Sequence, residues 1–111
     1  MTVEQLREAG VQVEEGLARC MNNEAFYLRM VGLGLADERF GTLGAALESG
    51  STQEAFEMAH ALKGVLANLA LTPVQQPVSR MTEILRGREE GDCKALWQEA
   101  LTERQKLLDL G

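Results

Sequence analysis

The fold is decided by residues 55–71, which read Ala55-Phe56-Glu57-Met58-Ala59-His60-Ala61-Leu62-Lys63-Gly64-Val65-Leu66-Ala67-Asn68-Leu69-Ala70-Leu71. On a helical wheel with roughly 100° per residue, the apolar side chains of this stretch gather at roughly 140° to 240° from His60. They are Ala55, Met58, Leu62, Val65, Leu66 and Leu69. Such a stripe is typical of a helix that buries one face in a protein core. The pattern therefore predicts a long helix from which His60 points to solvent.

Both ends of this central helix carry sequence signals. At the start, Ser51 and Glu54 are predicted to form a capping box, in which the Ser51 side chain caps the Glu54 amide and Glu54 reaches back to Ser51. At the other end, the helix is expected to run to about Leu71. There Thr72 supplies the next cap and Pro73 takes the first helical position.

Helical composition extends over the rest of the chain. Leu, Ala, Glu, Gln, Arg and Met dominate, prolines number only two, and β-branched residues are scarce. Two short helices are predicted at residues 2–10 and from about residue 13 to 21. A longer segment follows with Asn23 as its cap, and a joint near residues 36–37 leads it into a further apolar helix.

Two more helices are predicted after the central one. The first carries apolar residues to the Gly87 region, and the second begins after Asp92 and runs to the end of the chain. Helices of this length with short connections lie antiparallel to their sequence neighbours. The sequence therefore predicts an all-α fold, an antiparallel up-down four-helix bundle with short additional N-terminal helices. A single domain is expected over residues 1–111.

Composition and charge exclude several classes of protein. The 111 residues are 45% hydrophobic and 25% charged, as in a soluble globular domain, and no uncharged apolar run is long enough to span a membrane. The net charge of -6 argues against nucleic-acid binding, which needs clustered Lys and Arg. The first residues lack the basic start and apolar stretch of a signal peptide, so a cytoplasmic location is expected.

No metal or cofactor site is predicted in this chain. Cys20 and Cys93 form no CxxC pair, and with a single histidine they cannot assemble a usual zinc site. Phe56 and the methionines are interpreted as core or rim packing and not as a cofactor box. Asn68 is interpreted as a solvated helix position.

The residues around His60 favour a chemical role. A lone histidine on an exposed helix face is usually only a solvated residue, and two neighbours weigh against that interpretation here. Gly64 costs about 1 kcal/mol relative to alanine inside a helix, and it leaves the space beside the imidazole open to a partner. Lys63 brings a cation that offsets negative charge on a phosphoryl group. Phosphoryl transfer needs little more than such positioning and charge compensation.

A family resemblance is carried by Ala59-His60-Ala61-Leu62-Lys63-Gly64, which resembles the H-x-L-K-G signature of histidine phosphotransfer (Hpt) domains. The likeness extends over nearly the whole chain. It implies a four-helix bundle in which His60 accepts a phosphoryl group from a receiver-domain aspartate and passes it to another response regulator. Lys63 would compensate charge, and Gly64 would give the partner access. The chain departs from the family at Leu66 and Ala70, where members often carry a smaller residue or glycine.

The resemblance also implies the partners. These are receiver domains of response regulators and hybrid sensor kinases, and Mg²⁺ is expected in the partner receiver domain. No GxxxxGK[ST] motif for ATP occurs, so a phosphoryl carrier without kinase activity of its own is expected. The default oligomeric state is a monomer. Arg80, Arg86 and Arg88 on the following helix are candidates to seat an acidic receiver surface.

Other functions stay open at this point. The phosphoacceptor domain of a chemotaxis-type kinase shares the helical arrangement but takes its phosphoryl group from an ATP-binding domain of the same protein. A helical adaptor would bind a partner without phosphoryl chemistry. A metal-binding bundle is less favoured, because the inward Glu and His pairs of such bundles are absent.

Overall fold

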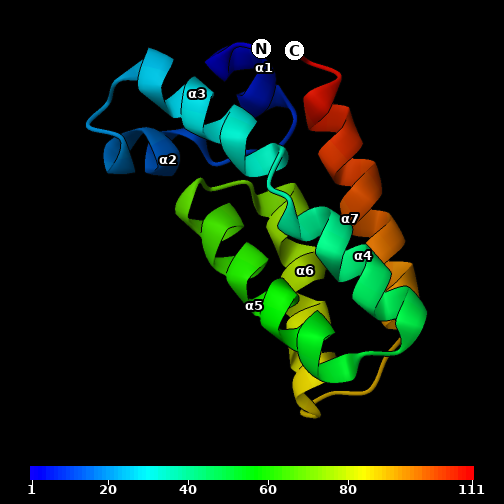
Figure 1. The fold of residues 1–111 in the computed structure, drawn as a ribbon. Coiled ribbons are helices and arrows are strands. Elements are labelled where there is room, and N and C mark those ends of the chain that lie inside the picture. Colours follow the sequence, from blue (N-terminus) through cyan, green and yellow to red (C-terminus); the bar gives the residue numbers. More distant parts are fainter.

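The computed structural model describes residues 1–111 and contains seven helices and no strands (Figure 1). The helices are α1 (Val3–Glu8), α2 (Val13–Arg19), α3 (Glu24–Leu35), α4 (Arg39–Ser49), α5 (Thr52–Asn68), α6 (Thr72–Arg86) and α7 (Cys93–Leu108). The all-helical prediction is confirmed. None of the helices combines the length and the apolar character that crossing a membrane requires.

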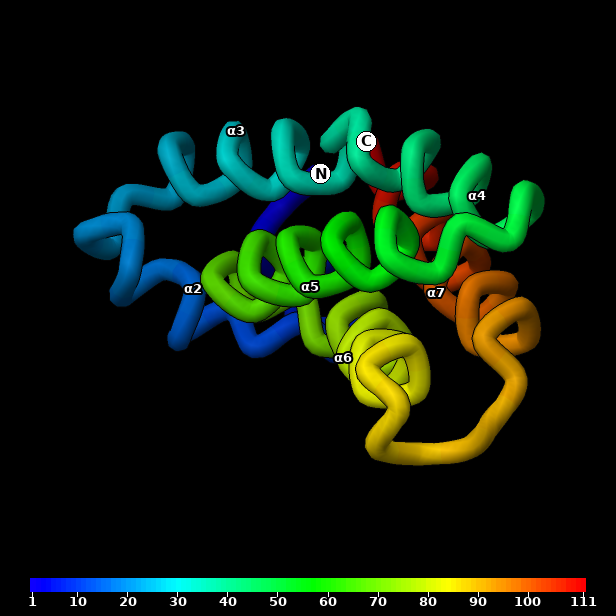
Figure 2. The backbone as a smooth tube through the Cα atoms, turned by 60° about the horizontal axis from the view of Figure 1, so that its bottom comes forward, coloured from blue at the N-terminus to red at the C-terminus, as the bar shows by residue number.

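The four helices α4 to α7 form the body of the molecule. Figure 1 shows consecutive helices of this group running in alternate directions. In Figure 2, α4 and α6 flank α5 on either side, and α5 packs against both while α6 also packs against α7. The buried side chains of all seven helices join into one hydrophobic cluster of 24 residues. The short N-terminal helices therefore share a core with the rest of the molecule.

The predicted joint near residues 36–37 separates α3 from α4. Figure 2 shows the two helices following one another along the same edge of the molecule. At the break, an Asp37 carboxylate oxygen accepts a hydrogen bond from the Arg39 amide at 2.9 Å. From α7, Arg104 donates through Nε to the carbonyl oxygen of Leu35 at 2.6 Å. The joint is thus closed by a local cap and by a side chain from the last helix.

The N-terminal helices cover the C-terminal end of α5. The Tyr27 hydroxyl of α3 donates to the carbonyl oxygen of Leu69 at 2.8 Å. Arg19, the last residue of α2, donates through Nη1 to the carbonyl oxygens of Ala67 at 3.0 Å and Asn68 at 3.2 Å. The last carbonyl groups of a helix have no partner within the helix, so these contacts supply what the end of α5 lacks.

The capping box predicted at the start of α5 is wrong. Ser51 is the N-cap residue, but its side chain accepts no hydrogen bond from the helix. The Ser51 hydroxyl lies 2.9 Å from the Ser49 hydroxyl, and the Ser51 amide donates to the carbonyl oxygen of Ala46 at 2.9 Å. Both groups that a capping box with Glu54 would use are therefore engaged by the preceding turn, in which Gly50 is left-handed with φ of 76°.

The end of α5 also differs from the prediction, because the helix stops at Asn68 and not near Leu71. Ala70 has φ of 59°, a left-handed conformation that a right-handed helix cannot include. The same turn moves the start of the next helix. Leu71 is the N-cap of α6, so Thr72 is already helical and is not the cap, and Pro73 follows as the second helical residue.

Candidate functional site

His60 lies in the middle of α5 and is exposed to solvent. The opposite side of the helix carries its buried residues, which are Ala55, Ala59, Leu62 and Leu66. The direction of the imidazole that the helical periodicity predicts is therefore confirmed. His60 is the single histidine of the chain, so any reaction of an imidazole in this protein takes place at this exposed position.

Open space adjoins the imidazole on the side of Gly64. A Cβ atom built on Gly64 would meet no atom within 4 Å. Side chains on a helix lean toward its N-terminus, so a residue at position 64 would lean toward the residue one turn earlier, which is His60. The glycine thus leaves the imidazole uncovered on this side, as the sequence predicted.

Lys63 carries the nearest cationic side chain along the helix, three residues after His60. It is half-buried and takes part in none of the five ion pairs of the molecule. Residues three apart on a helix are surface neighbours. The ammonium group is therefore available to a negative charge that forms on or near the imidazole.

An aromatic ring stands on the other side of His60. The half-buried Phe56 is stacked with the imidazole at 5.8 Å between ring centroids and an interplanar angle of 18°. Arg86 at the end of α6 places its Cζ atom 5.1 Å from the centroid of the Phe56 ring. The sequence pattern predicts only a packing role for Phe56. The contact with Arg86 joins two helices, so no local pattern in the sequence predicts it.

Among the three arginines named as candidates on the following helix, only Arg86 reaches this group. Arg80 and Arg88 are exposed and make no side-chain hydrogen bond or ion pair. Asn68 is exposed as well, and its backbone carbonyl, not its side chain, takes part in the contacts at the end of α5. The site therefore consists of a face of α5 with one contribution from α6.

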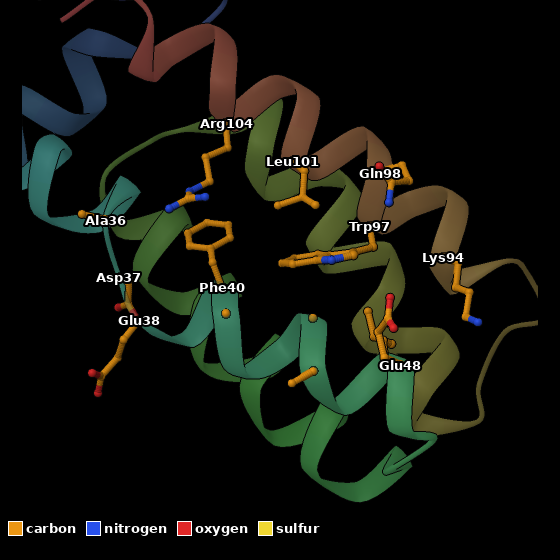
Figure 3. Close-up of a pocket in the computed structure, with 14 residues that line it drawn as sticks. Ala36, Asp37, Glu38, Phe40, Glu48, Lys94, Trp97, Gln98, Leu101 and Arg104 are labelled. Carbon is orange, nitrogen blue, oxygen red and sulfur yellow. The ribbon is translucent and has the colours of Figure 1, made fainter.

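The largest cavity of the molecule lies elsewhere, between α4 and α7 (Figure 3). It has a volume of about 650 Å³ and contains none of the predicted site residues. Phe40 and Trp97 stack in it at 6.0 Å, and Arg104 lies over the Phe40 ring at 4.3 Å. These groups hold α4, α7 and the joint before α4 together, which gives the aromatic cluster a structural role.

The remaining reactive side chains form no second cluster. No three His, Cys, Asp or Glu side chains lie close enough together to hold a metal ion. Cys20 is buried and Cys93 is partly buried, and both thiols are free. Burial raises the pKa of Cys93, so it holds its proton more firmly than an exposed thiol does.

Comparison with known proteins gives one match. A family model described as the Hpt domain matches residues 32–109, which begin within α3 and include all of α4 to α7. His60, Lys63 and Gly64 fall inside the matched region, whereas α1 and α2 lie outside it. No curated protein and no solved structure matches the chain.

Proposed function

Because this chain belongs to the Hpt domain family, whose members carry phosphoryl groups in two-component phosphorelays, we propose that it is a relay intermediate with His60 as its phosphoacceptor. The proposed donor is the phosphorylated aspartate of a receiver domain, and the proposed acceptor is the aspartate of another response regulator. The single observation that supports this role best is the exposed imidazole of His60 beside the open space at Gly64.

The proposed step is a displacement at phosphorus. The unprotonated nitrogen of the neutral imidazole attacks the aspartyl phosphate, and a bond forms between nitrogen and phosphorus. The bond from phosphorus to the aspartate oxygen breaks, and aspartate leaves as a carboxylate with the electron pair. The proton on the other ring nitrogen stays in place. Passing the group to a second aspartate is the same displacement in reverse.

Lys63 and Gly64 have different roles in this proposal. The Lys63 ammonium group compensates the negative charge of the phosphoryl oxygens during transfer, when charge compensation lowers the barrier. The open position at Gly64 allows the receiver to bring its aspartyl phosphate up to the imidazole without a collision. We propose that Mg²⁺ is supplied by the receiver domain, and that this chain acts as a carrier without kinase activity of its own.

The test begins with the purified chain and a panel of receiver domains, each phosphorylated with acetyl phosphate. Mass spectrometry is expected to find an acid-labile phosphate on His60 of the wild-type chain and none in a His60→Gln variant. Binding of the receivers without any label would instead identify a helical adaptor. Labelling only by an ATP-dependent histidine kinase domain, with no transfer from any receiver, would identify the phosphoacceptor domain of a chemotaxis-type kinase.

A further inference from the structure

The surroundings of the imidazole are asymmetric. On the side toward the start of α5, the Phe56 ring lies nearly parallel to the imidazole, 5.8 Å away. On the side toward the end of α5, Gly64 leaves nothing within 4 Å of the place where its Cβ would be. The His60 side chain is therefore exposed to solvent, but one face of its imidazole lies against the aromatic ring of Phe56.

The Phe56 ring is itself contacted by a residue of a second helix. The guanidinium carbon of Arg86 lies 5.1 Å from the centroid of the Phe56 ring, within the range of a cation-π contact. Arg86 also pairs through Nε with a Glu83 carboxylate oxygen at 3.4 Å. The contacts thus run from Glu83 and Arg86 in the last turn of α6, through Phe56, to His60 on α5. The position of the Phe56 ring beside the imidazole therefore depends on the packing of α5 against α6.

An unsupported imidazole on a helix surface rotates about two side-chain bonds, and only some orientations aim a ring nitrogen at an approaching phosphorus atom. In-line transfer is fast when the reacting atoms are held near the attack geometry. A stacked ring covers one face of the imidazole and leaves its edge, which carries both nitrogens, free. Stacking on Phe56 is therefore suited to limiting rotation without blocking the nucleophile.

Resting on the proposed role of His60, we infer that Phe56 and Arg86 are positioning residues that hold the imidazole plane of His60 for transfer. Phe56 sets the plane through the stack, and Arg86 keeps Phe56 in place. Neither residue supplies the nucleophile. This function differs from docking, in which the same two side chains would act only by touching the receiver.

The experiment compares matched variants. Phe56→Leu removes the ring and keeps an apolar side chain, whereas Phe56→Tyr keeps the ring. Arg86→Gln removes the cation over the ring, and Arg29→Gln removes the same charge from an exposed position on α3 that takes part in no ion pair. Two measurements are made on each variant: the rate of transfer from a phosphorylated receiver, and the NMR signals of the one imidazole in the chain. Thermal unfolding followed by circular dichroism verifies that every variant is folded.

The expected results separate the two aromatic variants. Transfer by Phe56→Leu is slowed about three- to tenfold, and transfer by Arg86→Gln about two- to threefold, because a free ring spends less time in the attack geometry. The ring-current shift that Phe56 gives the His60 protons disappears in Phe56→Leu and is reduced in Arg86→Gln. Phe56→Tyr and Arg29→Gln keep both the rate and the shift.

Several results would overturn the inference. Equal rates for Phe56→Leu and Phe56→Tyr, in a chain that is otherwise active, would refute positioning and leave the proposed function intact. Slower transfer with unchanged imidazole signals would show that Phe56 is a docking contact. A wild-type chain that accepts no phosphoryl group from any receiver would refute the proposed function, and the positioning role would fall with it. The imidazole signals would then still show whether the stack forms.

Discussion

Glycines lie in the middle of α5 and against its C-terminal end, and their surroundings are opposite. At Gly64 an added Cβ would meet no atom within 4 Å, so the glycine faces open space. At the end that α2 and α3 cover, a Cβ on Gly16 would overlap the Tyr27 ring, and a Cβ on Gly34 would lie 2.6 Å from Leu69 Cδ1. The two regions share a helix, but only one of them needs glycine in order to pack.

This difference separates two kinds of constraint on the sequence. Gly16 is buried, and the space that its missing side chain leaves is filled by Tyr27 from the same molecule. Gly64 is exposed, and nothing in the chain uses the space that it leaves. A glycine in a helix interior lowers stability relative to alanine. At Gly64, no packing contact within the chain compensates for this loss of stability. We propose that the reason for Gly64 lies outside the chain, in the partner that approaches His60.

The largest effect is expected at the packed glycine. Gly16→Ala should lower the free energy of unfolding by about 2 kcal/mol, because the added methyl group overpacks a buried contact and the gain in helix propensity offsets only part of the loss. Urea denaturation measures the change, and Gly32→Ala on α3 is a control with no atom within 4 Å of its Cβ. Wild-type stability in Gly16→Ala would show that the Tyr27 ring moves aside at little cost.

The next effect is on transfer and not on folding. Lys63→Ala should slow phosphoryl transfer about tenfold, or roughly 1.4 kcal/mol in the barrier, because the phosphoryl oxygens lose a nearby positive charge. Its melting temperature should stay close to that of the wild type, since Lys63 takes part in no ion pair. Lys94→Ala removes the same charge from an exposed position on α7 and should leave the rate unchanged. A wild-type rate in Lys63→Ala would refute the electrostatic role.

A smaller effect is expected at the hydrogen bond that anchors α3 to the end of α5. Tyr27→Phe should cost about 1 kcal/mol of stability at neutral pH, because the Leu69 carbonyl loses its donor. Burial raises the pKa of Tyr27 from 10.0 to about 12. The folded state therefore keeps the phenol proton that the unfolded chain releases, and the wild type should lose stability as pH rises from 10 toward 12.

The Tyr27→Phe variant should not show this alkaline loss, so the two stability curves should converge above pH 10. Tyrosinate absorbance in the wild type reports on Tyr27 alone, because the chain has one tyrosine. Parallel stability curves for the two proteins between pH 10 and pH 12 would show that the Tyr27 phenol is not protected by burial.

The surroundings of His60 and Gly64 were easier to predict from sequence than the C-terminal end of α5. The exposure of His60 and the space at Gly64 follow from helical periodicity and from the absence of a side chain, which are local properties. The joint between α3 and α4, the cap at Asn23 and the start of the last helix after Asp92 are local as well, and the structure has them where the sequence places them. Short-range rules are sufficient for such features.

The errors concern features that depend on contacts between distant residues. The end of α5 is fixed by Tyr27 and Arg19, more than forty residues earlier in the chain, and no local signal predicts these partners. Ala70 adopts a left-handed conformation that glycine favours. Because the residue is alanine and not glycine, the sequence carries no signal for a turn at this position. The Phe56 and Arg86 contact was missed for the same reason, since it joins two helices whose relative rotation the sequence pattern does not specify.

The smallest expected effect is at Gly64, where stability and function should move in opposite directions. Gly64→Ala should raise the free energy of unfolding by up to about 1 kcal/mol, because alanine is the better helix former and its methyl group enters open space. Transfer from a phosphorylated receiver should be slowed about threefold, or roughly 0.6 kcal/mol, because that methyl group leans toward the imidazole. Denaturant unfolding and transfer rates on the same preparation measure both quantities. A variant that gains stability and keeps the wild-type rate would mean that the receiver does not use this space, and the cost of Gly64 to the helix would then need another cause.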